Sequence, residues 1–116
     1  MKYVCLVYVV EKDMSALSKR EADACTEESL AYDAALRRSG HLIAAQALQP
    51  VETATTIRVR NGKLTTTDGP FAETPEQLGG FILIEARDLN DAIQVAAKIP
   101  MGRRGTIEVR PIKELT

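Results

Sequence analysis

The first ten residues are apolar on both sides of an extended chain. One face carries Tyr3, Cys5, Val7 and Val9, and the other carries Val4, Leu6 and Tyr8. A strand with two apolar faces is typical of the centre of a sheet. We therefore expect residues 1–10 to form a central β-strand.

A change of period after residue 17 predicts a long helix. Ser18 and Glu21 have the spacing of a capping box, in which each side chain bonds the other residue's backbone N–H. The side chains that follow recur at steps of three and four along one helical face, and they are Ala22, Cys25, Ser29, Tyr32 and Leu36. Gly40 supplies the left-handed residue that commonly ends a helix, and Arg37 and Arg38 suit its negative end.

The rest of the chain predicts a hairpin, a second helix and further strands. Asn61-Gly62 favours a type I′ turn, because both residues tolerate a positive φ. Asp88 and Asp91 fit the start of a helix that must end by Pro100. The strands are expected at 41–48, where alanines make the pattern weakest, and at 55–60, 63–67, 81–86 and 106–112.

This order predicts a single α+β domain over residues 1–116. It reads β-α-β, a hairpin, then β-α-β, which is a ferredoxin-like arrangement with an inserted hairpin. Two helices cover only one face of such a sheet, so the other face would expose Val4, Leu6, Ile82 and Ile84, or their opposite-face neighbours. Burying four such side chains contributes roughly 6–12 kcal/mol. We therefore expect a homodimer that packs through the sheet face.

Charge and composition narrow the range of partners. Fifteen Lys and Arg against sixteen Asp and Glu leave a net charge of -1, so no positive field attracts nucleic acid. No apolar run approaches the roughly 20 residues that span a bilayer, and the start lacks a signal-peptide cleavage site, so we expect no membrane partner and a cytoplasmic location. Cys5 and Cys25 do not have the spacing of metal ligands, and neither a metal nor a cofactor is predicted.

The segment 67–81 is too long for a tight turn and too patterned for a linker. Asp68 can cap its own turn, and Gly69 tolerates unusual backbone angles before a proline. Thr74-Pro-Glu-Gln77 has the pattern of a short helical turn with proline at its first position. We expect an ordered loop.

Asp68-Gly-Pro-Phe-Ala-Glu-Thr74 and Glu76-Gln-Leu-Gly-Gly-Phe81 resemble the signature of the DGPF-domain, or YCII-related, family. The other matching stretches are Met1-Lys2-Tyr3, Gly40, Leu48-Gln49-Pro50, Ala54-Thr55-Thr56 and residues 105–111. The resemblance implies a dimeric α+β barrel, the architecture that the apolar pattern also favours. It implies no particular reaction. Some members look like accessory partners of extracytoplasmic-function sigma factors, so a sigma-factor-linked partner is an alternative.

The wider YCII group places a histidine on the first helix and an aspartate directly before a proline after the last helix, proposed as an active-site pair. The corresponding positions here are Ser29 and Ile99. Isoleucine has no titratable group, and serine without a neighbouring base is a weak nucleophile. The resemblance therefore does not carry a catalytic pair over to this chain.

The candidate catalytic residues are Asp68 and His41. Asp68 could position or deprotonate a ligand beside Phe71, with Glu73 and Gln77 as polar contacts, or it could only hold its own turn. His41 is the only histidine and titrates near neutrality in its unperturbed form. Its place after a helix end also suits a cation that caps the helix.

Two further pairs are candidate ligand contacts. Arg103 and Arg104 lie between two glycines and could clamp a carboxylate or phosphate, although arginine pairs usually face water. Ser29 and Tyr32 lie on the inner face of the long helix, where they line a cavity or pack in the core. The sequence shows no phosphate-binding glycine loop, metal cluster or serine-triad motif.

We therefore expect a homodimeric barrel that binds a small organic ligand between sheet and helices, near the 67–81 loop. One alternative is a non-catalytic regulatory or interaction module. The other is an enzyme that uses Asp68 or His41 as an acid or base on a small polar substrate.

Overall fold

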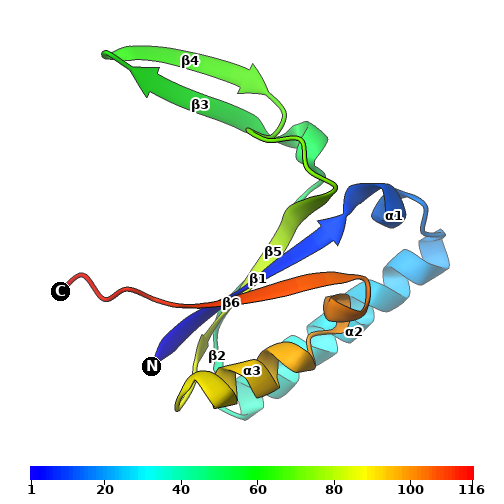
Figure 1. The fold of residues 1–116 in the computed structure, drawn as a ribbon. Coiled ribbons are helices and arrows are strands. Elements are labelled where there is room, and N and C mark those ends of the chain that lie inside the picture. The colour runs from blue at the N-terminus through cyan, green and yellow to red at the C-terminus, as the bar shows by residue number, and fades with distance from the viewer.

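The computed structural model describes residues 1–116 as a four-stranded sheet, a separate hairpin, and helices on one side of the sheet (Figure 1). The central strand β1 (Lys2–Val10) pairs antiparallel with β5 (Glu76–Glu85) and with β6 (Gly105–Pro111). Strand β2 (Leu42–Ala47) pairs with the outer edge of β5, which gives the order β2-β5-β1-β6. This arrangement is ferredoxin-like, as the sequence predicts.

Helices α2 (Lys19–Arg38) and α3 (Leu89–Ala97) begin at the predicted caps. The Glu21 N–H donates to Ser18 Oγ at 3.1 Å, and the Ser18 N–H donates to the Glu21 carboxylate at 3.0 Å. The Asp91 N–H donates to Asp88 Oδ1 at 2.8 Å. After α2 the chain turns at Gly40, whose φ of 81° explains the glycine. Three short elements were not predicted from the sequence, and they are α1 (Glu11–Ser15) and the 3₁₀ turns η1 (Val51–Thr53) and η2 (Pro100–Arg103).

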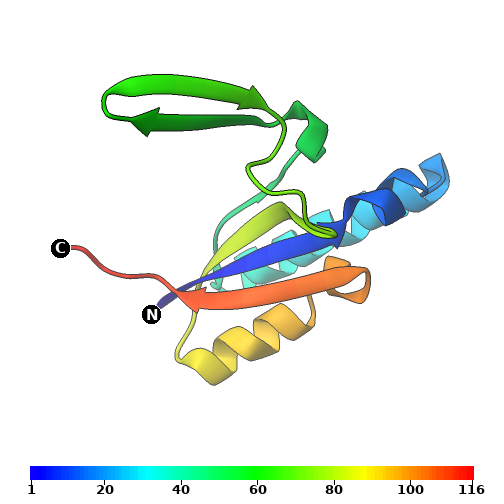
Figure 2. The ribbon, with the colours of Figure 1, turned by 45° about the horizontal axis from the view of Figure 1, so that its top comes forward.

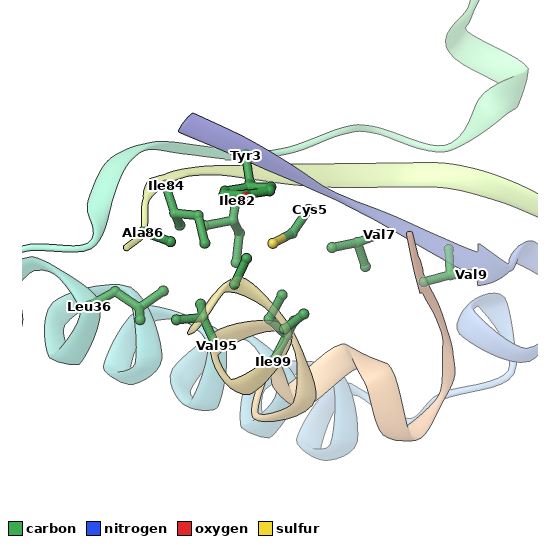
Figure 3. Packing of buried hydrophobic residues seen from close by; sticks show 12 residues of the cluster. Tyr3, Cys5, Val7, Val9, Leu36, Ile82, Ile84, Ala86, Val95 and Ile99 are labelled. Carbon is green, nitrogen blue, oxygen red and sulfur yellow. The ribbon is translucent and has the colours of Figure 1, made fainter. Parts of the chain in front are cut away.

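The core fills the space between the sheet and the helices (Figure 3). Alternate residues of β1 point toward the helices, and Leu36, Val95 and Ile99 meet them from the other side. The buried apolar residues are Tyr3, Cys5, Val7, Val9, Leu36, Ile82, Ile84, Ala86, Ala92, Val95, Ala96 and Ile99. None of the helices is both long and apolar enough to cross a membrane.

The strand register shows that the open sheet face is formed by a different set of residues from the one expected from the sequence. Val4 pairs with Leu83, and Leu6 pairs with Phe81, so these four side chains share the face away from the helices. Ile82 and Ile84 belong instead to the core, where they are only 7% and 0% exposed. The open face is therefore formed by Val4, Leu6, Phe81 and Leu83, all of them half-buried in the single chain.

The hairpin of β3 (Thr55–Arg60) and β4 (Lys63–Asp68) stands away from the sheet, on the side opposite the helices (Figures 1 and 2). The turn is the predicted one, with positive φ at both Asn61 (52°) and Gly62 (75°). Three large apolar side chains of the hairpin are more than half exposed, and they are Ile57, Val59 and Leu64.

Strand β5 begins five residues earlier than the sequence predicts. The expected helical turn at 74–77 is wrong, because Glu76 pairs with Val10 and Gln77 pairs with Val9. The long β1 offers backbone partners as far as Val10, and strand pairing there satisfies backbone groups that an isolated helical turn would leave to water.

Candidate functional site

An open cavity of about 500 Å³ lies where β1 leads into α1 and where β5 and β6 begin. We call it the arginine cavity. Its lining residues are Asp13, Met14, Glu76, Arg103, Arg104 and Gly105. Glu76 begins β5 and belongs to the second half of the signature, so part of the segment that carries the family resemblance lines the cavity. The predicted arginine pair thus lines a real concavity.

The charges in this cavity are only partly neutralised within the chain. Arg103 forms an ion pair with Glu28 of α2, and Glu76 Oε1 accepts a hydrogen bond from Thr106 Oγ1 at 2.8 Å. Arg104 and Asp13 form no ion pair. An arginine with free N–H groups presents a planar array of donors that matches a carboxylate or a phosphate.

The predicted ligand residues of the loop do not converge on one site. The Phe71 side chain is 78% exposed, and Glu73 is also exposed. The Gln77 amide is occupied within the loop, where it donates to the Ala72 carbonyl at 2.8 Å. Asp68 is exposed at the end of β4, and its carboxylate makes no hydrogen bond that would hold the turn.

Ser29 and Tyr32 lie on the inner face of α2. The Tyr32 hydroxyl donates to the Val95 carbonyl at 2.6 Å, which ties α2 to α3. Burial raises the pKa of Tyr32, with a smaller contribution from the nearby Cys5 thiol. Ser29 is half-buried on the same helical face. The space between helices and sheet is occupied by core side chains, and neither polar cavity lies in it.

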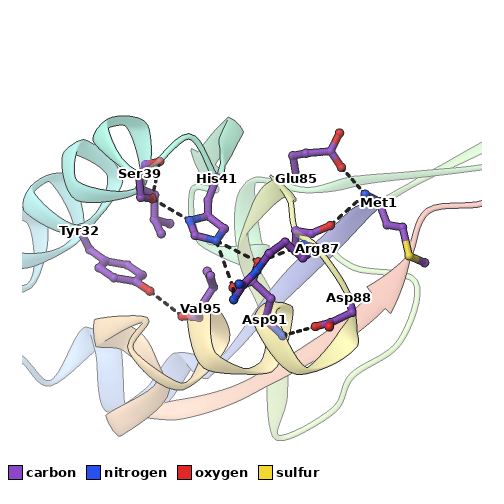
Figure 4. A network of polar contacts seen from close by, with 11 residues as sticks. Met1, Tyr32, Ser39, His41, Glu85, Arg87, Asp88, Asp91 and Val95 are labelled. Atoms are coloured by element: carbon purple, nitrogen blue, oxygen red, sulfur yellow. Dashed lines mark hydrogen bonds and ion pairs between the residues drawn. The ribbon is translucent and has the colours of Figure 1, made fainter.

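A second open cavity of about 370 Å³ lies at the other end of β5. Its lining residues are Ser39, Gly40, His41, Glu85, Ala86, Arg87 and Asp91. The predicted candidate His41 lies here, held on both ring nitrogens (Figure 4). Its Nδ1 lies 2.7 Å from Ser39 Oγ, and its Nε2 lies 3.2 Å from Asp91 Oδ2. Asp68 lies in the hairpin instead, so the structure does not bring the two catalytic candidates together.

Asp91 is the partner that the sequence analysis missed. Its side chain is only 11% exposed, and it accepts hydrogen bonds from the Arg87 N–H at 3.0 Å and from His41. The Arg87 backbone N–H, and after it the His41 and Arg87 side chains, hold the pKa of Asp91 below its usual value. In the sequence, the preference for acidic residues in the first turn of a helix is enough to explain Asp91, so no neighbouring residue indicated a contact with His41.

The remaining reactive side chains are dispersed. Burial raises the pKa of the Cys5 thiol to about 11, and neither cysteine forms a disulfide. No group of three or more His, Cys, Asp or Glu side chains is placed to hold a metal ion.

Comparison with known proteins places the whole chain in one family. The model of the YCII-related domain matches residues 1–116. The chain is also 36% identical over 114 residues to an uncharacterized protein of Rhizobium meliloti (strain 1021), a match that covers 97% of this chain and 92% of that protein. The loop motif and the fold agree with this match. The chain belongs to the YCII-related domain family.

Proposed function

We propose that the protein binds a small organic ligand bearing a carboxylate or phosphate group in the arginine cavity. The observation that carries the proposal is Arg104, an unpaired guanidinium that lines a cavity of about 500 Å³. A cavity of this size falls within the range of about 300–1,000 Å³ in which small ligands bind. The anionic group would lie against Arg104, with Arg103 able to join it by leaving Glu28.

The two carboxylates of the cavity define the rest of the ligand. Asp13 is unpaired, and Glu76 accepts only one hydrogen bond, from Thr106. Both can therefore accept hydrogen bonds from hydroxyl or amino groups of the ligand. A small polar molecule that carries an anionic group together with such donors fits this distribution better than an apolar one.

A thermal-shift screen of carboxylates, amino acids and sugar phosphates tests the proposal. A ligand present at 100 times its Kd stabilises the folded chain by about 2.7 kcal/mol. Arg104→Gln should abolish the shift caused by any hit, whereas Arg58→Gln on the hairpin should keep it, since Arg58 lies outside the cavity. An equal shift in both variants, or no shift with any of these compounds, would contradict the proposal.

We further propose that the chain forms a homodimer through the open sheet face. Val4, Leu6, Phe81 and Leu83 form this face and are half-buried in the single chain. Completing their burial contributes at most about 1 kcal/mol per side chain on each copy. The hairpin supports the same partner, because an isolated two-stranded hairpin is marginal in water and this one stands on the open-face side (Figure 2).

Sedimentation or light scattering at micromolar concentration tests this assembly. The wild type should have twice the mass of one chain, and Leu83→Glu should have the mass of a monomer, because the change buries an unpaired charge in the interface. Leu30→Glu is the matched control, since Leu30 is 63% exposed on α2 and faces away from the sheet. A monomeric wild type would refute the dimer.

A further inference from the structure

The cavity that holds His41 contains the three side chains of a nucleophile, a base and an orienting carboxylate. Ser39 Oγ lies 2.7 Å from His41 Nδ1. His41 Nε2 lies 3.2 and 3.3 Å from the two oxygens of Asp91. This is the connectivity of serine hydrolases, in which a base bonds the nucleophile and a carboxylate orients the base. The ring nitrogens exchange roles here, with Nδ1 toward the serine.

The carboxylate decides which nitrogen carries the proton. Ionised Asp91 accepts hydrogen bonds but donates none, so His41 Nε2 must be the protonated nitrogen of a neutral ring. Nδ1 then carries the lone pair, which is directed at the Ser39 hydroxyl. Asp91 is 11% exposed and His41 is 23% exposed, so water competes weakly for the bond between them, whereas Ser39 is exposed to solvent. A substrate can reach the nucleophile without displacing its base.

A positive group is available in the same cavity. Arg87 lies at 3.5 Å from Asp91 Oδ1 through one guanidinium nitrogen, while its side chain is 86% exposed. Its other N–H groups remain free to stabilise an oxyanion, the role that donors commonly have in acyl transfer. Ser39 also has a resting contact, because its hydroxyl lies 3.0 Å from the Leu36 carbonyl. The Ser39 hydroxyl has one proton, so at any moment it donates either to the Leu36 carbonyl or to His41 Nδ1.

We propose that Ser39, His41 and Asp91 form a nucleophilic site that accepts acyl groups from small esters. Ser39 Oγ attacks the ester carbonyl and passes its proton to His41 Nδ1. The alcohol leaves with that proton, and an acyl-Ser39 ester remains. Water then attacks the acyl group, loses a proton to His41 and releases the carboxylic acid, which restores Ser39 with its proton. Arg87 faces the oxyanion in both steps.

Labelling with an alkyl fluorophosphonate, and with 4-nitrophenyl acetate, tests the site on the intact chain. Mass spectrometry of peptides should place the adduct on Ser39. His41→Gln should lower the labelling rate at least about 100-fold, the usual minimum for a general base. Circular dichroism should show that this variant is folded.

Ser15 provides a matched control within the same chain. It is also exposed near a helix end, and its hydroxyl donates to the Lys12 carbonyl at 3.0 Å, the same contact that Ser39 makes with Leu36, but it has no imidazole beside it. Ser15→Ala should label as the wild type does, and Ser39→Ala should not label. Labelling of Ser39 no faster than of Ser15, or no faster than in the urea-unfolded chain, would overturn the proposal whether or not the His41 variant folds.

Discussion

Replacing Gly105 by alanine should destabilise the fold strongly, whereas the same change at Gly102 should not. Gly105 begins β6 and pairs with Val9. A Cβ at residue 105 would lie 1.9 Å from the Tyr8 carbonyl oxygen, which belongs to the backbone of the central strand. Neither strand can move away without loss of pairing. A Cβ at Gly102 would lie 3.4 Å from a side-chain carbon of Ile107, which is close to ordinary contact.

The expected loss of stability depends on which atoms the added Cβ meets. Overpacking a core typically costs about 1–3 kcal/mol, and a clash with fixed backbone belongs at or above the top of that range. A chain of this length loses about 0.24 kcal/mol of stability per degree near its melting temperature, so a loss of 3 kcal/mol lowers the Tm by about 12 °C. Gly102→Ala should stay within about 1 kcal/mol of the wild type.

Urea denaturation of both variants, followed by circular dichroism, measures this difference. The two glycines flank the same arginine pair, so a general effect of alanine on the arginine cavity would appear in both variants. Similar stabilities for the two variants would refute the steric reasoning.

Three further predictions concern the network and the core. The pKa of Asp91 lies below its ordinary 3.8 in the folded chain, so its ionised form stabilises the fold above that pH, and this contribution is lost as the pH falls from 3.8 toward the lowered pKa. Asp91→Asn should therefore make the stability of the fold depend less on pH in that window of an acid unfolding experiment. An unchanged pH dependence would contradict this role of Asp91. Tyr32→Phe should cost about 1 kcal/mol in urea denaturation, because the Val95 carbonyl loses its donor. A disulfide reagent at neutral pH should titrate Cys25, which is half-buried, well before Cys5, and both thiols should react at once in denaturant.

The elements that the sequence predicts well are those whose causes lie within a few residues. The capping box at Ser18, the aspartate cap at Asp88 and the turn at Asn61-Gly62 each depend on neighbours in the chain, and the structure confirms all three. The alternation in β1 is equally local and correctly indicates a central strand.

The features that the sequence could not predict depend on register and on distant contacts. The start of β5 at Glu76 is set by how far β1 extends as a pairing partner. The placement of Ile82 and Leu6 on opposite faces is set by the alignment of β1 with β5, whose paired residues are 66 or more positions apart in the sequence. His41 and Asp91 are 50 positions apart and meet only because the end of α2 and the start of α3 lie together. Residue type alone was enough to select His41 as a candidate, but it did not identify Asp91 as its partner.

The two cavities of the molecule lie at opposite ends of β5. Glu76 lines the arginine cavity and Glu85 lines the cavity of His41, and these two residues begin and end β5. Ten residues of strand span about 30 Å, and the two cavities share no lining residue. Substitutions at such separations usually add within about 0.5 kcal/mol. Arg104→Gln should therefore change ligand binding without altering Ser39 labelling, and His41→Gln should do the reverse. Loss of both properties in either variant would mean that the two ends form one site, which in a dimer would require the second chain to bring them together.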